Sequence, residues 1–292
     1  MNVNRRILLR KYNYLLPVIV LLIAITIFPL VYSLVVSLTN LRLTAMEGPQ
    51  FAGLKNYYEI LFHDKRFWRS LYNTFTIAVP ALALESVLGM AIALLLNRGI
   101  RGKRIITVLL ILPVVIPTIT SGLIWRMLYH EKYGAINGLL YYFGIERQIT
   151  WLSTPGLTKF AVILTDVWQW TPFMMMMILA GLQSIPVECI EAAEVDGASA
   201  FQRFIHITLP MLRYTIMVAA LLRIMDLIKV FDVIFVLTMG GPGGTTETIS
   251  MYTYIVSFRA FRMGFGSALS YLVLIITVIL CTYFIKVVRG RS

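Results

Sequence analysis

Charged residues are scarce in this sequence. Only 14% of its 292 residues are Asp, Glu, Lys or Arg, whereas 59% are apolar and the mean hydropathy is +0.80. Soluble domains carry about one-quarter charged residues, so this composition excludes a water-soluble globular protein. It predicts instead a chain that is mostly embedded in a bilayer.

Cysteines and nucleotide-binding loops are also lacking. The two cysteines, Cys189 and Cys281, are too few for a disulfide framework. The phosphate-loop pattern G-x-x-x-x-G-K-[ST] does not occur, and neither a cluster of metal ligands nor a nucleophile with its base stands out. We therefore expect a protein that is not an enzyme, holds no cofactor and hydrolyses no ATP by itself.

Long runs with few charges divide the chain into candidate spans. A helix of ~20 apolar residues crosses a bilayer, and six runs reach this length, although charged residues interrupt the fifth. The first run is too long for a signal peptide, so we expect it to be retained. The sequence predicts an all-α polytopic membrane protein whose single domain, 1–292, has six transmembrane helices at about 14–38, 71–96, 105–128, 158–181, 211–239 and 265–286.

Basic residues gather at the short hydrophilic ends, which the positive-inside rule places in the cytoplasm together with both termini. The net charge of +12 reflects this distribution, so we expect no nucleic-acid partner. The first predicted outer loop, 39–70, departs from the rule, because it carries five basic residues of its own. The inward-facing residues are Arg5, Arg6, Arg10, Lys11, Arg98, Arg101, Lys103, Arg104, Lys286, Arg289 and Arg291.

The predicted inner segment 184–210 is amphipathic and rich in acids. Pro186 favours the start of a short helix, Gly197 supplies a joint, and a second helix follows until Pro210. Such a segment suits a protein partner; the other interpretation is a hairpin on lipid headgroups, which acids facing an anionic leaflet disfavour. One face of the first helix holds Ile190, Ala193 and Glu194, and one face of the second holds Phe201, Phe204, Ile205 and Thr208.

A motif in this segment resembles the EAA loop of permease subunits of binding-protein-dependent ATP-binding-cassette (ABC) importers. The matching run is Glu191-Ala192-Ala193, Asp196-Gly197-Ala198, Phe204, Ile207 and Leu209-Pro210. In that family the loop is a coupling helix that docks into a groove on the cytoplasmic ATPase subunit. The resemblance implies the type I ABC-importer permease fold and assigns coupling to Glu191, Ala192, Ala193, Asp196, Gly197, Ala198, Phe204, Ile207 and Pro210.

Segments elsewhere resemble the carbohydrate branch of the family, in particular the larger transmembrane subunit of the maltose importer. The matching stretches are Phe231 to Thr248 with Tyr252 and Tyr254, Gly53 to Tyr57, Arg66 to Trp68, and Asn73-Thr74. The resemblance covers nearly the whole chain, which lacks a large outer insertion. It implies location in a bacterial or archaeal inner membrane and import of a sugar or a related polyol or glycoside. The implied partners are a second homologous permease, two ABC ATPase subunits that hold ATP and Mg, and an extracytoplasmic solute-binding protein.

Ionisable residues inside the spans are costly and are usually functional or paired. They are Glu85, Asp166, Arg223, Asp226, Lys229 and Asp232. Asp166 and Arg223 lie near the middle of a ~30 Å hydrocarbon core. Gln169, Trp170 and Phe173 share a helix face with Asp166, and such a mixture of polar and aromatic groups suits a sugar. With the resemblance, this predicts a substrate site of Asp166, Gln169, Trp170, Phe173, Arg223 and Asp226.

Two alternatives stay open. The three-residue spacing of Arg223, Asp226, Lys229 and Asp232 also fits a self-neutralised ladder along one helix. A secondary transporter that uses Asp166 or Asp226 as a proton site would need neither nucleotide nor a partner chain. We expect an importer permease that works by alternating access, driven by closure of separate ATPase subunits.

Overall fold

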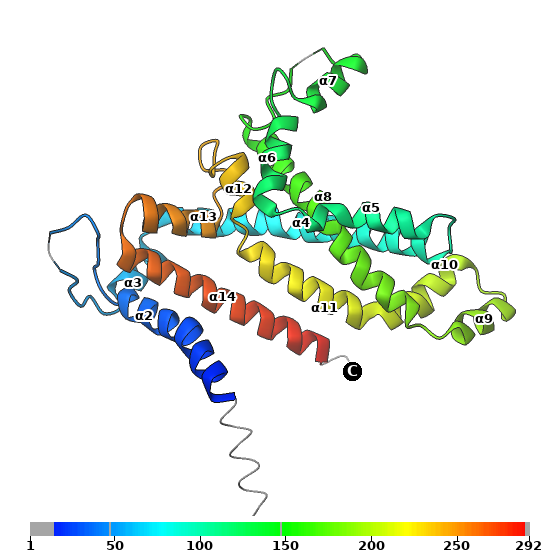
Figure 1. The fold of residues 1–292 in the computed structure, drawn as a ribbon, viewed down its shortest axis with the longest axis horizontal. Helices are drawn as coiled ribbons and strands as arrows, with labels where there is room; N and C mark the ends of the chain where they lie inside the picture. The colour runs from blue at the N-terminus through cyan, green and yellow to red at the C-terminus, as the bar shows by residue number, and fades with distance from the viewer. Residues whose placement is uncertain (1–14, 47, 147, 290–292) are drawn as a thin grey trace, which may run out of the picture. The chain divides into compact units, whose positions relative to one another are not determined.

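The computed structural model describes residues 15–46, 48–146 and 148–289, and the predicted cytoplasmic ends with Arg5 and Arg291 lie outside this part. The chain forms two compact units, residues 1–64 with 253–275 and residues 65–252 with 276–292. The regular secondary structure of the described residues is helical, apart from one isolated bridge between Thr39 and Phe51, and turns and loops join the helices. The elements (Figure 1) are η1 (Ile23–Ile27), α2 (Phe28–Ser37), α3 (Lys55–Phe62), α4 (Lys65–Asn97), α5 (Lys103–Val115), α6 (Thr118–Leu128), α7 (Ala135–Tyr142), α8 (Pro155–Gln183), α9 (Val187–Val195), α10 (Ala200–Arg203), η2 (Phe204–Thr208), α11 (Leu209–Ile228), α12 (Asp232–Leu237), α13 (Ile249–Tyr254), η3 (Ile255–Arg259) and α14 (Met263–Arg289).

The first unit joins the end of the first span to the start of the last. The hydroxyl of Tyr271 on α14 donates a hydrogen bond to the carbonyl of Leu30 on α2. Asn56 on α3 donates to the carbonyls of Ser37 and Thr39, each at 2.8 Å. The last carbonyls of a helix have no partner within it, so the Asn56 amide satisfies those that α2 leaves free.

The second unit is built around α8, which packs against α4, α5 and α11 (Figure 1). Gly89 on α4 lies against this helix: a Cβ there would come within 2.7 Å of Met174 Cβ and 2.9 Å of Met175 N. Transmembrane helices rely on such small residues for close approach, because lipid supplies no hydrophobic force between them. Glycine at position 89 therefore permits the α4–α8 contact.

The predicted membrane spans are largely present. Among the described residues, five helical segments are long and apolar enough to cross a bilayer, and a bent pair brings the number to six if it is one span. The single segments are Leu15–Ser37, Lys65–Asn97, Pro155–Gln183, Ala200–Ile228 and Met263–Lys286. The fold class is thus confirmed as an all-helical membrane protein.

The third predicted span, 105–128, is not one continuous helix. Helices α5 and α6 meet at an angle of 96°, and the break falls at Ile116 and Pro117. Proline disfavours helical backbone in the residue before it and has no N–H to donate. The carbonyl of Ile116 instead accepts a hydrogen bond of 3.0 Å from Gln169 Nε2 on α8.

The helix bounds differ from those of the predicted fifth span. Helix continues from Ala200 through Pro210 to Ile228, rather than running over 211–239. Pro210 follows directly after the π-helical stretch η2, and such local π adjustments allow a proline inside a spanning helix. Beyond Lys229 the backbone leaves the helix, and α12 is a separate short element.

Candidate functional site

The segment predicted to couple to an ATPase forms two helices joined by a glycine turn. Gly197 has a φ of +78°. Its N–H donates to the carbonyl of Glu194 at 3.1 Å, and the N–H of Ala198 donates to that of Ala193 at 2.9 Å. This is a Schellman cap, whose left-handed residue is usually glycine. The predicted joint at Gly197 is confirmed.

The second helix begins with its own cap. The hydroxyl of Ser199 accepts the N–H of Gln202 at 3.3 Å, and the Gln202 side chain accepts the N–H of Ser199 at 2.7 Å. Arg203 forms an ion pair of 3.0 Å with Glu194 and donates to the carbonyl of Ala198 at 3.1 Å. Reciprocal caps fix the start of a helix, and Arg203 ties this helix to α9. Local sequence therefore sets the angle between α9 and α10.

The exposed surface of this hairpin is both acidic and apolar. Val195 is 88% exposed and Phe201 is 73% exposed. These two apolar side chains lie on the same hairpin as the exposed acids Glu191 and Asp196. The sequence analysis did not include Val195 among the coupling residues. Its only distinguishing feature in the sequence is an apolar side chain between two acidic residues. Of the residues assigned to coupling, Glu191, Ala192, Asp196, Gly197 and Pro210 are exposed, and Ala193, Ala198, Phe204 and Ile207 are half-buried.

One detail of the predicted hairpin is wrong. Ile190 and Ala193 are half-buried, and Glu194 is engaged by Arg203, so this side of α9 is not the one left open. Ile190 and Phe204 instead line a groove of about 410 Å³ that also includes Leu94 at the inner end of α4. The available face of α9 is the one that carries Glu191 and Val195.

A buried ionic cluster links three helices in the middle of the second unit. Arg223 on α11 donates to both carboxylate oxygens of Glu85 on α4, through Nε at 2.7 Å and Nη2 at 3.0 Å. The same Nη2 donates to the carboxylate of Asp166 on α8. The three side chains are 0–3% exposed. Arginine suits this role because its planar fork holds two carboxylates at once.

The buried ionic cluster differs in composition from the predicted substrate site. Asp166 and Arg223, predicted to face a substrate, are in contact with each other, and Glu85, which was not included, completes the group. Glu85 lies 138 residues from Arg223, so no local pattern could have paired them. Its one sequence signal was a lone carboxylate in an otherwise uncharged run.

The aromatic part of the expected site lies beside this cluster. The ring of Trp170 lies 4.8 Å from the Arg223 guanidinium, a cation–π contact, and Phe173 meets Trp170 edge-on at 6.4 Å. Both aromatic side chains are half-buried. The side-chain oxygen of Gln169 is buried without a hydrogen-bond partner among the described residues. Trp170, Phe173 and the ionic cluster therefore form one continuous group.

Asp226 does not join this group. Its side chain is 57% exposed and lies 4.0 Å from Lys229 Nζ. Of the alternative ladder of four charges, only the Asp226–Lys229 pair forms. Arg223 pairs with Glu85 on α4 and Asp166 on α8, and α11 ends at Ile228, before Asp232. An exposed carboxylate on a spanning helix is costly against lipid, so Asp226 must face water or another protein chain.

The turn at Gly240 to Gly244 is anchored to α4. Glu247 pairs with Arg66 through bonds of 2.8 and 2.6 Å and accepts the hydroxyl of Ser70 at 3.2 Å. The amide of Asn73 donates to the carbonyls of Gly244 and Glu247 at 2.8 and 3.1 Å. The two segments that suggested a sugar permease by sequence thus form one contact. In the described residues no three His, Cys, Asp or Glu are grouped to hold a metal ion.

Comparison with known proteins decides the family. Residues 85–290 match the family described as the inner membrane component of binding-protein-dependent transport systems. This chain belongs to that family. It is a multi-pass inner-membrane permease of an ABC importer and not itself an enzyme. Membership excludes the self-powered secondary transporter that the buried acids left open.

Curated relatives match this permease over nearly its full length. It is 37% identical over 283 residues to the trehalose/maltose transport system permease protein MalF of Thermococcus litoralis, covering 96% of this chain and 94% of the relative. It is 34% identical to the sulfoquinovosyl glycerol transport system permease protein SmoG of Agrobacterium fabrum, covering 95% and 90%. The predicted kinship with the carbohydrate branch is confirmed by these matches.

The fold of this permease also matches that of a solved structure. A chain of a bacterial ABC transporter involved in the import of the acidic polysaccharide alginate superposes with a TM-score of 0.84 at 23% identity, over 99% of this permease and 97% of that chain. At this identity the match shows the fold alone. It confirms the predicted permease fold of ABC importers.

Proposed function

We propose that this permease imports a carbohydrate, delivered by an extracytoplasmic binding protein, by alternating access driven by ATP hydrolysis on partner subunits. The assembly contains a second homologous permease and two ABC ATPase subunits, each permease offering its coupling hairpin to one ATPase. The observation that carries the proposal is the exposed, internally braced α9–α10 hairpin, with Val195 and Phe201 uncovered beside acids. The names of the curated relatives support the carbohydrate class.

The sugar path in this proposal runs beside Trp170 and Phe173. Their half-buried rings offer flat apolar faces, and the neighbouring Asp166, Gln169 and Arg223 offer polar groups. Since Asp166 and Arg223 are closed against Glu85 in this conformation, they would reach a sugar only when α4, α8 and α11 move apart during transport. Asp226, exposed on the same helix as Arg223, would face the path or the second permease.

The test of this proposal is ligand-stimulated ATP hydrolysis. The chain would be purified with the proteins encoded beside it and reconstituted in proteoliposomes. ATP hydrolysis should rise when the liganded binding protein is added, and labelled sugar should accumulate on the opposite side. Sugar uptake that proceeds without ATP would contradict the proposed energy source, and stimulation by amino acids alone would contradict the substrate class.

Trp170→Ala should reduce sugar uptake by about fivefold or more while the ATPase still co-purifies. Loss of a stacked aromatic surface is worth roughly 1–3 kcal/mol, and each 1.4 kcal/mol is tenfold. The readout is initial uptake rate alongside complex recovery. Trp68→Ala, at a half-exposed tryptophan of α4 (52%) away from the cluster, is the matched control. Equal uptake by wild type and Trp170→Ala would reject this path.

The proposed orientation can be tested with a native thiol. Cys189 is exposed on α9, so a membrane-impermeant thiol reagent should leave it unlabelled in intact cells and label it in inside-out vesicles stripped of ATPase. Rebinding the ATPase should protect it. In a chain without native cysteines, Gly243→Cys should label in intact cells, since the 240–244 turn lies at the opposite end. Labelling of Cys189 in intact cells would overturn the topology.

A further inference from the structure

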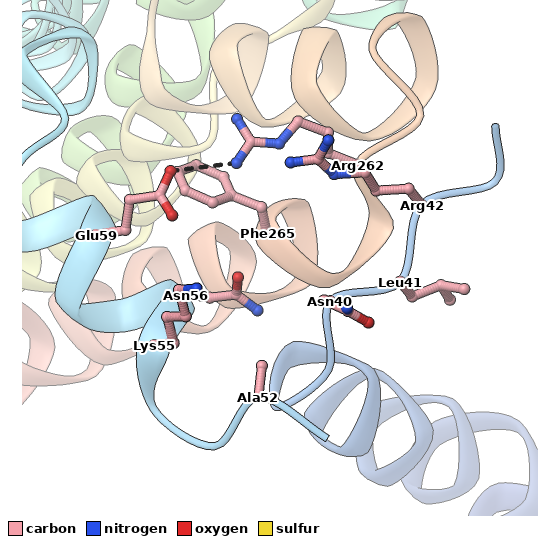
Figure 2. Close-up of a pocket in the computed structure, with 9 residues that line it drawn as sticks. All are labelled: Asn40, Leu41, Arg42, Ala52, Lys55, Asn56, Glu59, Arg262 and Phe265. Atoms are coloured by element: carbon pink, nitrogen blue, oxygen red, sulfur yellow. Dashed lines mark hydrogen bonds and ion pairs between the residues drawn. The ribbon is translucent and has the colours of Figure 1, made fainter. Parts of the chain in front are cut away.

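A small polar pocket lies within the first unit, where the end of α2, the start of α3 and the start of α14 meet (Figure 2). Its volume is about 100 Å³. Small-molecule sites usually occupy about 300–1,000 Å³, so this pocket has room for one small group and not for a sugar. Its polar lining consists of Asn40, Arg42, Lys55, Asn56, Glu59 and Arg262.

The pocket has an excess of positive charge. Three basic side chains line it, against the single carboxylate of Glu59, which accepts a bond of 3.3 Å from Arg262. Arg42 and Arg262 both line the pocket, as Figure 2 shows. No carboxylate forms an ion pair with Arg42 or Lys55 among the residues that the structure describes. Like charges repel, so an anion held among these basic groups would lower the electrostatic energy.

The backbone around the pocket is fixed independently of any ligand. The amide of Asn56, only 8% exposed, ties α3 to the end of α2. The N–H of Leu43 donates to the carbonyl of Phe261, and that of Gly264 donates to the carbonyl of Leu41, each at 3.0 Å. These bonds hold the segments that carry Arg42 and Arg262 together. The backbone that carries Arg42 and Arg262 is therefore preorganised, which lowers part of the entropic cost of binding.

The pocket also lies next to the ends of two candidate spans. Arg42 follows the first span, which ends at Ser37, and Arg262 directly precedes the last span. The ends of spanning helices lie at headgroup level. Below this level, α2 leaves apolar side chains open to contact, among them Val31 (49% exposed) and Val35 (57% exposed). A lipid phosphate in the pocket would place its acyl chains along this surface.

We propose that this pocket binds the phosphate of a phospholipid headgroup. Arginine guanidinium groups form short and often bidentate hydrogen bonds to phosphate, which are stronger than bonds between neutral groups. Phe265, whose ring lies 4.3 Å below the Arg262 guanidinium, keeps that group turned toward the pocket. The proposal also accounts for basic residues in a loop where the positive-inside rule disfavours them, and it does not depend on the transported substrate.

The test is lipid retention by the full chain. Purified permease would be stripped of lipid in neutral detergent and titrated with phosphatidylglycerol, with bound lipid counted by native mass spectrometry. Arg42→Gln combined with Arg262→Gln should weaken the tightest binding event by about tenfold or more, as expected for lost hydrogen bonds to a charged group. Arg259→Gln is the matched control, because Arg259 is exposed in the same unit outside the pocket and should leave that event unchanged.

Measurements with other ligands distinguish a phospholipid headgroup from other anions in the pocket. A neutral glycolipid with the same acyl chains should show no dependence on the two arginines. Inorganic phosphate at equal concentration should compete only weakly; binding as tight as the lipid would overturn a lipid source, and stronger displacement by glutamate would indicate a carboxylate partner instead. If the double variant does not fold, Lys55→Gln, at an exposed side chain, provides the same comparison. Unchanged lipid affinity in the arginine or lysine variant would reject the proposal.

Discussion

Replacing Gly197 with proline should separate this permease from its ATPase while leaving it inserted in the membrane. Gly197 adopts a φ of +78°, which proline cannot reach, and its N–H closes the cap on α9. The change would reorient α9 relative to α10 without touching the membrane helices. Co-purification of the ATPase should fall nearly to background, and transport should be lost with it.

Two further variants make this result specific. Gly197→Asn should retain most of the binding, because asparagine tolerates left-handed backbone and nothing lies within 4 Å of a Cβ at this position. Glu191→Lys keeps the turn but reverses a charge on the exposed face of α9, and it should also weaken ATPase recovery. If the proline variant binds ATPase as wild type does, the hairpin is not the docking element.

Replacing Arg223 with methionine should destabilise the whole second unit. Removing one member of a buried ion pair typically costs about 3–5 kcal/mol, because it leaves an uncompensated charge. Here the substitution would leave the carboxylates of Glu85 and Asp166, which are 0–3% exposed, without their cationic partner. The expected result is a large fall in the melting temperature of the detergent-solubilised chain, with poor assembly into the complex.

A neutral triple variant separates stability from transport. Glu85→Met, Asp166→Leu and Arg223→Met together should recover most of the melting temperature, since replacing a whole buried ionic group by hydrophobic residues of similar volume is often nearly neutral. Complex assembly should return as well. If sugar uptake stays low in this folded variant, the cluster also serves the substrate; if uptake returns fully, its role is only to hold α4, α8 and α11 together.

A structural feature of this protein can be predicted from the sequence when the residues that form it lie close together in the chain. Spans follow from composition along a continuous run, so hydropathy located them to within a few residues where the helix is straight. Pro117 is a sequence signal for a break in the third run, but it does not give the angle, because a run that turns by 96° has the same composition as a straight one. The helix that begins at Ala200 does not end at Pro210, because a π-helical stretch directly before this proline accommodates it.

The α9–α10 hairpin was determined by the sequence alone. Its glycine turn, its helix caps and its ion pair all join residues close in the chain, such as Gly197 with Glu194 and Ser199 with Gln202. The buried cluster was decided only by the tertiary structure. Arg223 lies on the same helix as Asp226, which the spacing offered as a partner, yet it pairs with Asp166, 57 residues away, and Glu85, 138 residues away. A buried charge takes its partner from whichever helix packs against it, and that packing brings together residues distant in the sequence.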